Sequence, residues 1–101
     1  MINVDPAILA AQAASESGGV AAMTGAAAAA SGPACAVIPP GADDVSVRAA
    51  AVLNGRGAAT TGILSEFIAM RELFAGVVGT NGATYSAVEA INTTAATIGG
   101  A

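Results

Sequence analysis

The sequence has no histidine, no lysine, no tryptophan and a single cysteine, Cys35. The lone cysteine excludes an intrachain disulfide. Without histidine, the usual base that activates a serine or cysteine nucleophile is missing. No metal-ligand pattern is visible, and no glycine-rich loop is followed by the lysine that a phosphate-binding loop requires. We therefore expect neither an enzyme nor a protein that holds a metal or another cofactor.

Charge is also scarce, with seven acidic residues against three arginines and a net charge of −4. An acidic chain repels the phosphates of a nucleic acid, so nucleic-acid binding is disfavoured. Anchoring on an anionic membrane surface requires basic residues and is disfavoured for the same reason.

The segment Ser17–Ala42 carries no charge, but it is a poor membrane span. A spanning helix needs about 20 strongly apolar residues, and this segment is mostly alanine with Ser, Thr, Gly and Pro. The first charges of the chain, Asp5 and Glu16, are negative, whereas a secretory signal peptide begins with a positive region. We expect neither a transmembrane helix nor a cleaved signal of the standard kind.

Much of the 54% apolar content is alanine, and the only aromatic residues are Phe67, Phe74 and Tyr85. Alanine buries little area but favours helix more than any other residue. Small side chains also let helix backbones approach closely. The composition therefore predicts an all-α protein with a thin interior.

Asp5 and Pro6 predict the start of a first helix over about residues 6–32. The carboxylate can accept hydrogen bonds from the first free N–H groups, and proline at the first helical position forfeits no donor. Gly32-Pro33 is expected to end or kink this helix. Gly18-Gly19 and Gly25 weaken it by roughly 1 kcal/mol each relative to alanine, which favours close packing of another helix there.

A turn over about residues 33–43 follows, because Pro39-Pro40-Gly41 cannot continue a helix. Asp43 or Asp44 then caps a second helix, with Ser46 close enough to assist. This helix is expected over about residues 44–78. Its end is predicted from Gly79 and the pair Asn81-Gly82.

Within the second helix, Gly55, Gly57 and Gly62 predict a thin or flexible middle, or close contact with the first helix. A stripe of large apolar residues follows spacings of four and three: Ile63, Phe67, Met70, Phe74 and Val77. Supporting positions lie beside or before it: Leu64, Ile68, Val52 and Leu53.

An alanine-rich first helix cannot cover a stripe this wide. We therefore expect an antiparallel two-helix hairpin that completes a four-helix bundle with a partner protein.

Several segments together resemble the PE family, the short N-terminal domains of mycobacterial proteins exported by type VII (ESX) secretion systems. They are the lead to Pro6, the alanine-rich first helix, the turn "VIPPGADDVS", the paired phenylalanines and the closing "YSAVEA". The last is similar to the family's Tyr-x-x-x-Asp/Glu export signal, with Tyr85 and Glu89 in the two places. One departure is that Pro6 is followed by Ala7 and not by the glutamate of the family name, although Asp5 supplies a negative charge nearby.

The resemblance implies a non-enzymatic subunit that pairs with a PPE protein as an obligate heterodimer. Residues 1–84 would form the hairpin and residues 85–101 the secretion-signal tail. An EspG-type chaperone would grip the PPE subunit in the cytosol. The folded pair would then leave through the ESX machinery and end secreted or at the cell surface.

Three other readings stay open at this point. The apolar stripe could pack inside a self-sufficient hairpin or a homodimer. The uncharged Ser17–Ala42 region could insert in the outer envelope and contribute to nutrient transport. The chain could also remain in the cytosol as an adaptor.

Overall fold

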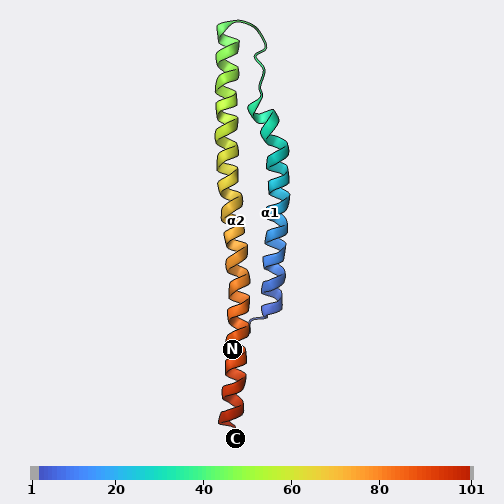
Figure 1. The fold of residues 1–101 in the computed structure, drawn as a ribbon, viewed down its shortest axis with the longest axis vertical. Helices are drawn as coiled ribbons and strands as arrows, with labels where there is room; N and C mark the ends of the chain where they lie inside the picture. Colours follow the sequence, from blue (N-terminus) through green and yellow to red (C-terminus); the bar gives the residue numbers. More distant parts are fainter. Residues whose placement is uncertain (1–2, 101) are drawn as a thin grey trace. The chain divides into compact units, whose positions relative to one another are not determined.

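The computed structural model describes residues 3–100, and in that part of the chain it contains two α-helices and no strand. Helix α1 spans Pro6–Cys35 and helix α2 spans Asp44–Gly99 (Figure 1). Residues 36–43 between them are non-helical and are called the connector here. The prediction of an all-α chain with two long helices is confirmed.

The chain divides into two compact units. Unit 1 comprises Met1–Gly18 and Arg71–Ala101, and unit 2 comprises Gly19–Met70. Each helix therefore contributes one segment to each unit, and the connector belongs to unit 2. The two units are described separately.

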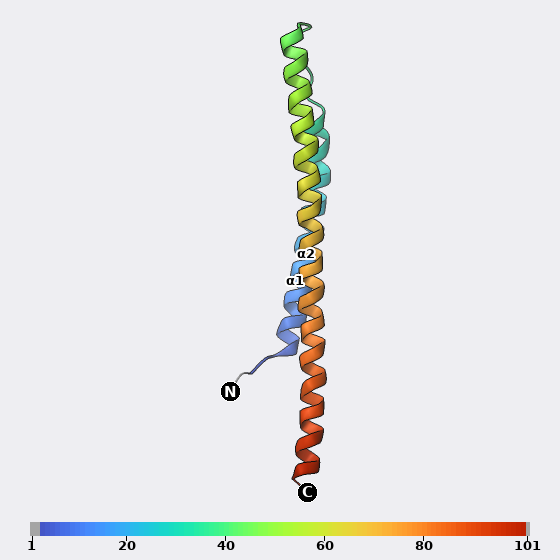
Figure 2. The same cartoon turned by 90° about the vertical axis from the view of Figure 1, so that its left-hand side faces the viewer.

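Unit 2 is an antiparallel helical hairpin, with its two helical segments side by side in Figure 1 and one behind the other in Figure 2. Near the connector, the end of α1 at Ala34 lies against Gly57 of α2. Further from the connector, Thr24 of α1 and Ile68 of α2 face each other across a shared opening. Residue numbers therefore decrease along α1 in the direction in which they increase along α2, so the two segments are antiparallel.

Unit 1 pairs the first turns of α1 with the second half of α2 in the same antiparallel order. Glu16 is ion-paired with Arg71, Gly79 lies beside Ala13, and Gly82 lies beside Leu9. Gly82 is the last buried residue of α2, and every residue from 83 to 100 is exposed. Within this unit, the last turns of α2 extend beyond the start of α1 (Figure 1).

Both helices begin at an aspartate cap. The Asp5 carboxylate accepts a hydrogen bond from the Ala7 N–H at 2.9 Å. The Asp43 carboxylate accepts one from the Ser46 N–H at 2.9 Å and another from the Ser46 hydroxyl at 2.8 Å. Asp43 is thus the capping residue of α2, and Asp44 is the first helical residue. The bond from the Ser46 N–H, followed by that from its hydroxyl, lowers the pKa of the Asp43 carboxyl below its ordinary value.

Helix α1 does not end at Gly32-Pro33, because Pro33 lies inside it and the helix continues to Cys35. Proline lacks an N–H and costs one backbone hydrogen bond. Since Pro33 falls in the last turn, the loss does not propagate to later turns, and the helix tolerates it.

The predicted end of α2 near residue 78 is also wrong, because α2 continues to Gly99. A glycine that ends a helix adopts a positive φ, and no described glycine does so. Gly82 instead serves close approach, whereas a Cβ on Gly79 would make an ordinary contact with the Ala13 Cβ at 3.6 Å. A Cβ on Gly82 would lie 3.2 Å from the Leu9 Cβ and 3.4 Å from the Pro6 carbonyl oxygen.

Close packing explains only some of the other glycines. A Cβ on Gly57 would overlap the Ala34 carbonyl oxygen, as the prediction of close contact requires. Gly18, Gly25, Gly55 and Gly62 have open space where a Cβ would stand, so the prediction of helix packing is wrong at Gly18 and Gly25.

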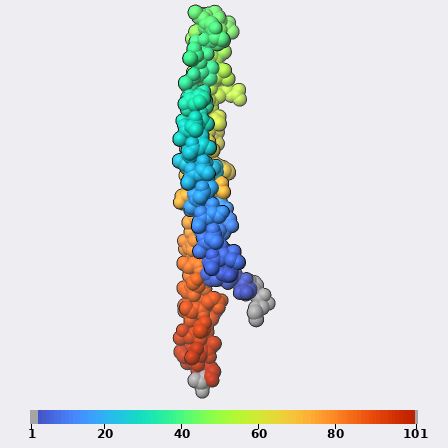
Figure 3. Space-filling model, turned by 90° about the vertical axis from the view of Figure 1, so that its right-hand side faces the viewer, coloured from blue at the N-terminus to red at the C-terminus, as the bar shows by residue number. Residues whose placement is uncertain are grey.

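The described chain has almost no buried core. Its only buried hydrophobic residues are Ala50 in unit 2 and Ala75 in unit 1. In each unit α1 covers one side of α2, and in unit 2 the yellow-green atoms of α2 stay visible beside it (Figure 3). The large side chains that would fill a core lie elsewhere on α2.

Candidate functional site

The apolar stripe of α2 faces solvent in both units. Its members are all exposed, Phe67 by 60% and Phe74 by 53%. In unit 2 they are Ile63, Phe67 and Met70, with Val52 and Leu53 earlier on the helix; in unit 1 they are Phe74 and Val77. In many proteins, a surface with this many exposed apolar side chains is covered by another molecule.

Leu64 and Ile68, predicted as support for this stripe, are half-buried and lie elsewhere. Ile68 lines the opening between the two helices of unit 2, together with Thr61. Leu64 is three residues after Thr61 and four before Ile68, so it shares their face. Both residues therefore pack toward α1, and the prediction that placed them with the stripe is corrected.

Unit 1 exposes further apolar residues that the sequence analysis did not include. Leu73 is 71% exposed, and beyond Val77 the large aliphatic side chains exposed in the described chain are Val88, Ile91 and Ile98. The signal was present, because the spacings of four and three continue through 77, 81, 84, 88, 91, 95 and 98. It was missed because Gly79 and Gly82 were interpreted as the end of the helix.

Tyr85 and Glu89 lie on α2 and not in an irregular tail. Residues four apart are neighbours on a helix surface, so the phenol and the carboxylate lie one turn apart on one face. Tyr85 is 44% exposed and lines a shallow pocket of about 300 Å³ with Asn81, Thr84 and Val88. Glu89 is exposed, and no described side chain is hydrogen-bonded to its carboxylate. Both groups are accessible to a protein that would read them together.

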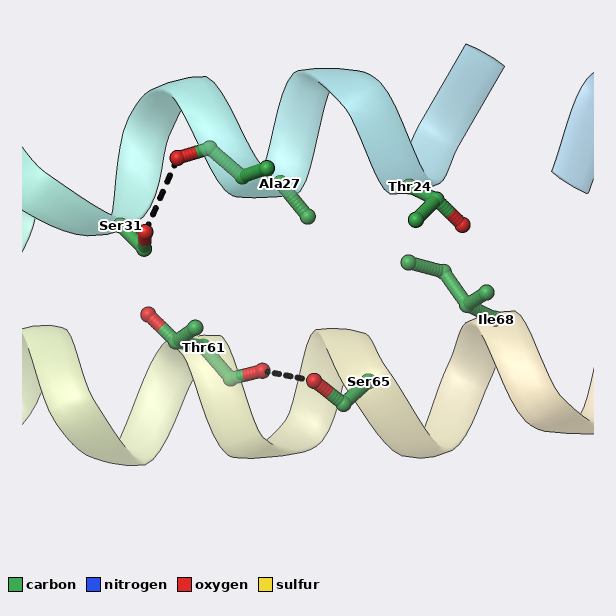
Figure 4. A pocket seen from close by; sticks show the side chains of 7 residues that line it. Thr24, Ala27, Ser31, Thr61, Ser65 and Ile68 are labelled. Atoms are coloured by element: carbon green, nitrogen blue, oxygen red, sulfur yellow. Dashed lines mark hydrogen bonds between the residues drawn. The ribbon is translucent and has the colours of Figure 1, made fainter. Parts of the chain in front are cut away.

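A second opening, of about 320 Å³, lies between the helices of unit 2 (Figure 4). Four of its seven lining residues carry hydroxyls: Thr24, Ser31, Thr61 and Ser65. Each hydroxyl donates to a carbonyl of its own helix, as Ser31 does to Ala28 at 2.9 Å and Ser65 to Thr61 at 3.0 Å. Because these hydrogens are already engaged, the opening offers no free donor and no charge with which to select a polar ligand.

No candidate metal centre is found in residues 3–100. That range contains no group of three or more His, Cys, Asp or Glu side chains placed to hold a metal ion. Cys35 is exposed at the end of α1. Neither described helix combines the length and apolar character needed to cross a membrane.

Two polar contacts between elements were not anticipated. Arg71 Nε donates to Glu16 Oε2 at 2.9 Å in unit 1, and Asn54 is hydrogen-bonded to Val37 in unit 2. A sequence signal existed for the first contact. Arg71 falls at the helical spacing of Leu64, Ile68, Ala75 and Val78, which is the face toward α1.

Comparison with known proteins gave one match. Neither the curated proteins nor the solved structures contained a match to the chain. The model of the PE family matches residues 2–92, which include all of α1 and most of α2. This match covers far more than half of the sequence, and the chain therefore belongs to the PE family.

Proposed function

We propose that this PE protein is a non-enzymatic subunit that pairs with a PPE protein and is exported with it by a type VII secretion system. Tyr85 and Glu89 are the secretion signal in this proposal. An EspG-type chaperone holds the PPE subunit in the cytosol, and the pair ends secreted or at the cell surface. Membership of the PE family supports this role.

The observation that carries the proposal is the contrast between the core and the surface. Only two alanines are buried hydrophobic residues in the described chain, whereas Phe67, Phe74 and their neighbours in the stripe are exposed. Full burial of one large apolar side chain stabilises a fold by about 1.5–3 kcal/mol. Most of the apolar area that would stabilise these helices is therefore still available to a second protein.

The proposed partner is itself helical. An exposed stripe with spacings of four and three fits into the grooves of neighbouring helices, as in four-helix bundles. Two helices of a PPE protein would complete such a bundle and cover the stripe. The chain would then gain from its partner the core that it lacks alone.

Co-expression with each PPE protein of the source genome tests the pairing. Phe67→Asp and Phe74→Asp should each abolish co-purification, because a buried, unpaired charge is costly. Ala69→Asp is the matched control, since Ala69 is exposed on α2 two residues after Phe67 and off the stripe. The proposal fails if the native chain captures no PPE protein, or if both Phe variants still capture the partner.

The signal is tested by export. Tyr85→Ala and Glu89→Ala should each leave the pair in the cell pellet while co-purification with the PPE protein is retained. Glu72→Ala removes an exposed carboxylate from the same helix and should leave export unchanged. If culture filtrates contain both signal variants at native levels, the assignment of Tyr85 and Glu89 is wrong.

A further inference from the structure

The side chain of Asn54 makes two hydrogen bonds to a single residue of the connector. The Val37 N–H donates to Asn54 Oδ1 at 2.7 Å, and Asn54 Nδ2 donates to the Val37 carbonyl oxygen at 3.2 Å. Both residues are half-buried. Two backbone residues exchange the same pair of bonds in an antiparallel ladder. Here a side-chain amide takes the place of one backbone.

Val37 needs these bonds because its neighbours provide none. Helix α1 ends at Cys35, so Val37 lies outside the ladder of helical hydrogen bonds. Pro39 and Pro40 follow and have no N–H to contribute to a turn. A half-buried backbone N–H and carbonyl without partners would destabilise the fold. Asparagine carries one acceptor and two donors on a short side chain and so satisfies both groups.

Gly57 makes the second contact with the same region. It lies three residues after Asn54 and therefore shares its side of α2. The Ala34 carbonyl lies directly against it, and a Cβ on Gly57 would stand 2.7 Å from the Ala34 carbonyl carbon. The nearby Gly55 and Gly62 have nothing within 4 Å of a Cβ. Of these three glycines, only Gly57 is required by packing.

Asparagine and glycine are both poor helix formers. They nevertheless occupy two positions of α2 that contact the end of α1 and the connector. A residue that opposes its local structure is expected to be offset by a tertiary contact, and these two residues have one each.

We propose that Asn54 and Gly57 form a latch that holds the end of α1 and the connector on α2, and that this latch fixes the register of the hairpin in unit 2 before any partner binds. The latch is a property of this chain and does not depend on PPE pairing. A hairpin ordered in advance loses less conformational freedom when it binds another protein.

Amide hydrogen exchange of Val37 in the full chain measures the latch directly. The Val37 amide should be protected in the native protein and should exchange about tenfold faster in Asn54→Ala, which removes both bonds. Asn54→Asp keeps an acceptor but has no donor, so its rate should fall between those two. Asn92→Ala is the matched control on an exposed asparagine of the same helix and should leave the rate unchanged.

The glycines give a second, independent comparison. Gly57→Ala should accelerate exchange at Val37 because the new methyl group displaces the end of α1, whereas Gly55→Ala should not. The proposal is overturned if the Val37 amide is unprotected in the native chain. It is also overturned if Asn54→Ala behaves as Asn92→Ala does, or Gly57→Ala as Gly55→Ala does.

Discussion

Arg71 Nε donates to Glu16 Oε2 at 2.9 Å, and this ion pair joins the α1 and α2 segments of unit 1. The Glu16 side chain is 18% exposed and that of Arg71 is 35% exposed. Glu16 also accepts a bond from Gln12 Nε2 at 2.8 Å, one turn earlier on α1. Both oxygens of the carboxylate are thus engaged, Oε1 by Gln12 and Oε2 by Arg71.

We expect Arg71→Ala to lower the free energy of unfolding by about 1 kcal/mol, the upper range for a pair that remains partly solvated. A double-mutant cycle with Glu16→Ala, followed by thermal loss of helix, isolates the pair from the other contacts of each residue. Arg56→Ala, at an exposed arginine of α2, should have little effect. A coupling energy of zero in the cycle would show that the pair does not stabilise unit 1.

The glycines of unit 1 should respond in different ways to an added methyl group. Gly76 has open space around a Cβ, so Gly76→Ala should raise the free energy of unfolding by about 1 kcal/mol through helix propensity. In Gly82→Ala the added methyl group would crowd Leu9 and Pro6, so this variant should show no increase in the free energy of unfolding. Thermal melts of the two variants measure this difference. An equal increase in stability would mean that the close approach of α1 does not require a glycine at position 82.

The cap of α2 predicts a dependence on pH. Hydrogen bonds from Ser46 lower the pKa of Asp43 in the folded state, so the ionised cap stabilises the start of α2 above the ordinary aspartate value near 3.8. This contribution should be lost as the pH falls through the lower folded pKa. Asp43→Ala should lower the thermal midpoint at neutral pH. The midpoint of this variant should also decrease less than that of the native protein when the pH is lowered.

Asp44→Ala is the control for the cap, because Asp44 is the first helical residue and its carboxylate accepts no hydrogen bond from an N–H of the described residues. It retains only a favourable interaction with the helix dipole. A larger effect of Asp44→Ala than of Asp43→Ala would contradict the assignment of the cap.

Helical continuity between Tyr85 and Glu89 can be tested with proline. Ala87→Pro removes a backbone donor within α2 and disrupts the turn at a cost of about 3 kcal/mol or more. Export should fall while pairing with the PPE protein persists, since Ala87 follows the last buried residue of α2. Ala87→Ser is the matched control, and immunoblots of culture filtrate and cell pellet provide the measurement. Undiminished export of the proline variant would show that the signal is read without a helix.

The sequence was sufficient for the helices but not for all of their ends. Asp5-Pro6 and Asp43 mark starts because a cap and a proline act locally, on the next few residues. Gly79 and Asn81-Gly82 were misleading because a glycine either reverses the chain or admits a neighbouring backbone. Only the position of Leu9 and Pro6 in space decides between the two uses.

The candidate site, too, could be predicted from the sequence only in part. Phe67 and Phe74 could be placed on one helix face from their spacing alone. The division between the exposed stripe and the face of Leu64 and Ile68 could not, because it depends on where α1 lies. The bonds between Asn54 and Val37 connect residues 17 apart, and no periodic pattern indicates them.

The packing of α1 against α2 ends at Gly82, and the two residues of the proposed signal lie at different distances beyond that point. Tyr85 follows within one turn of that last anchor, whereas Glu89 stands a full turn further out on a helix with no neighbour in the described chain. A helix without packing frays from its free end inward. Tyr85 therefore lies where packing against α1 still stabilises the helix. The Glu89 carboxylate lies one turn from the Tyr85 phenol only while the last turns of α2 are helical.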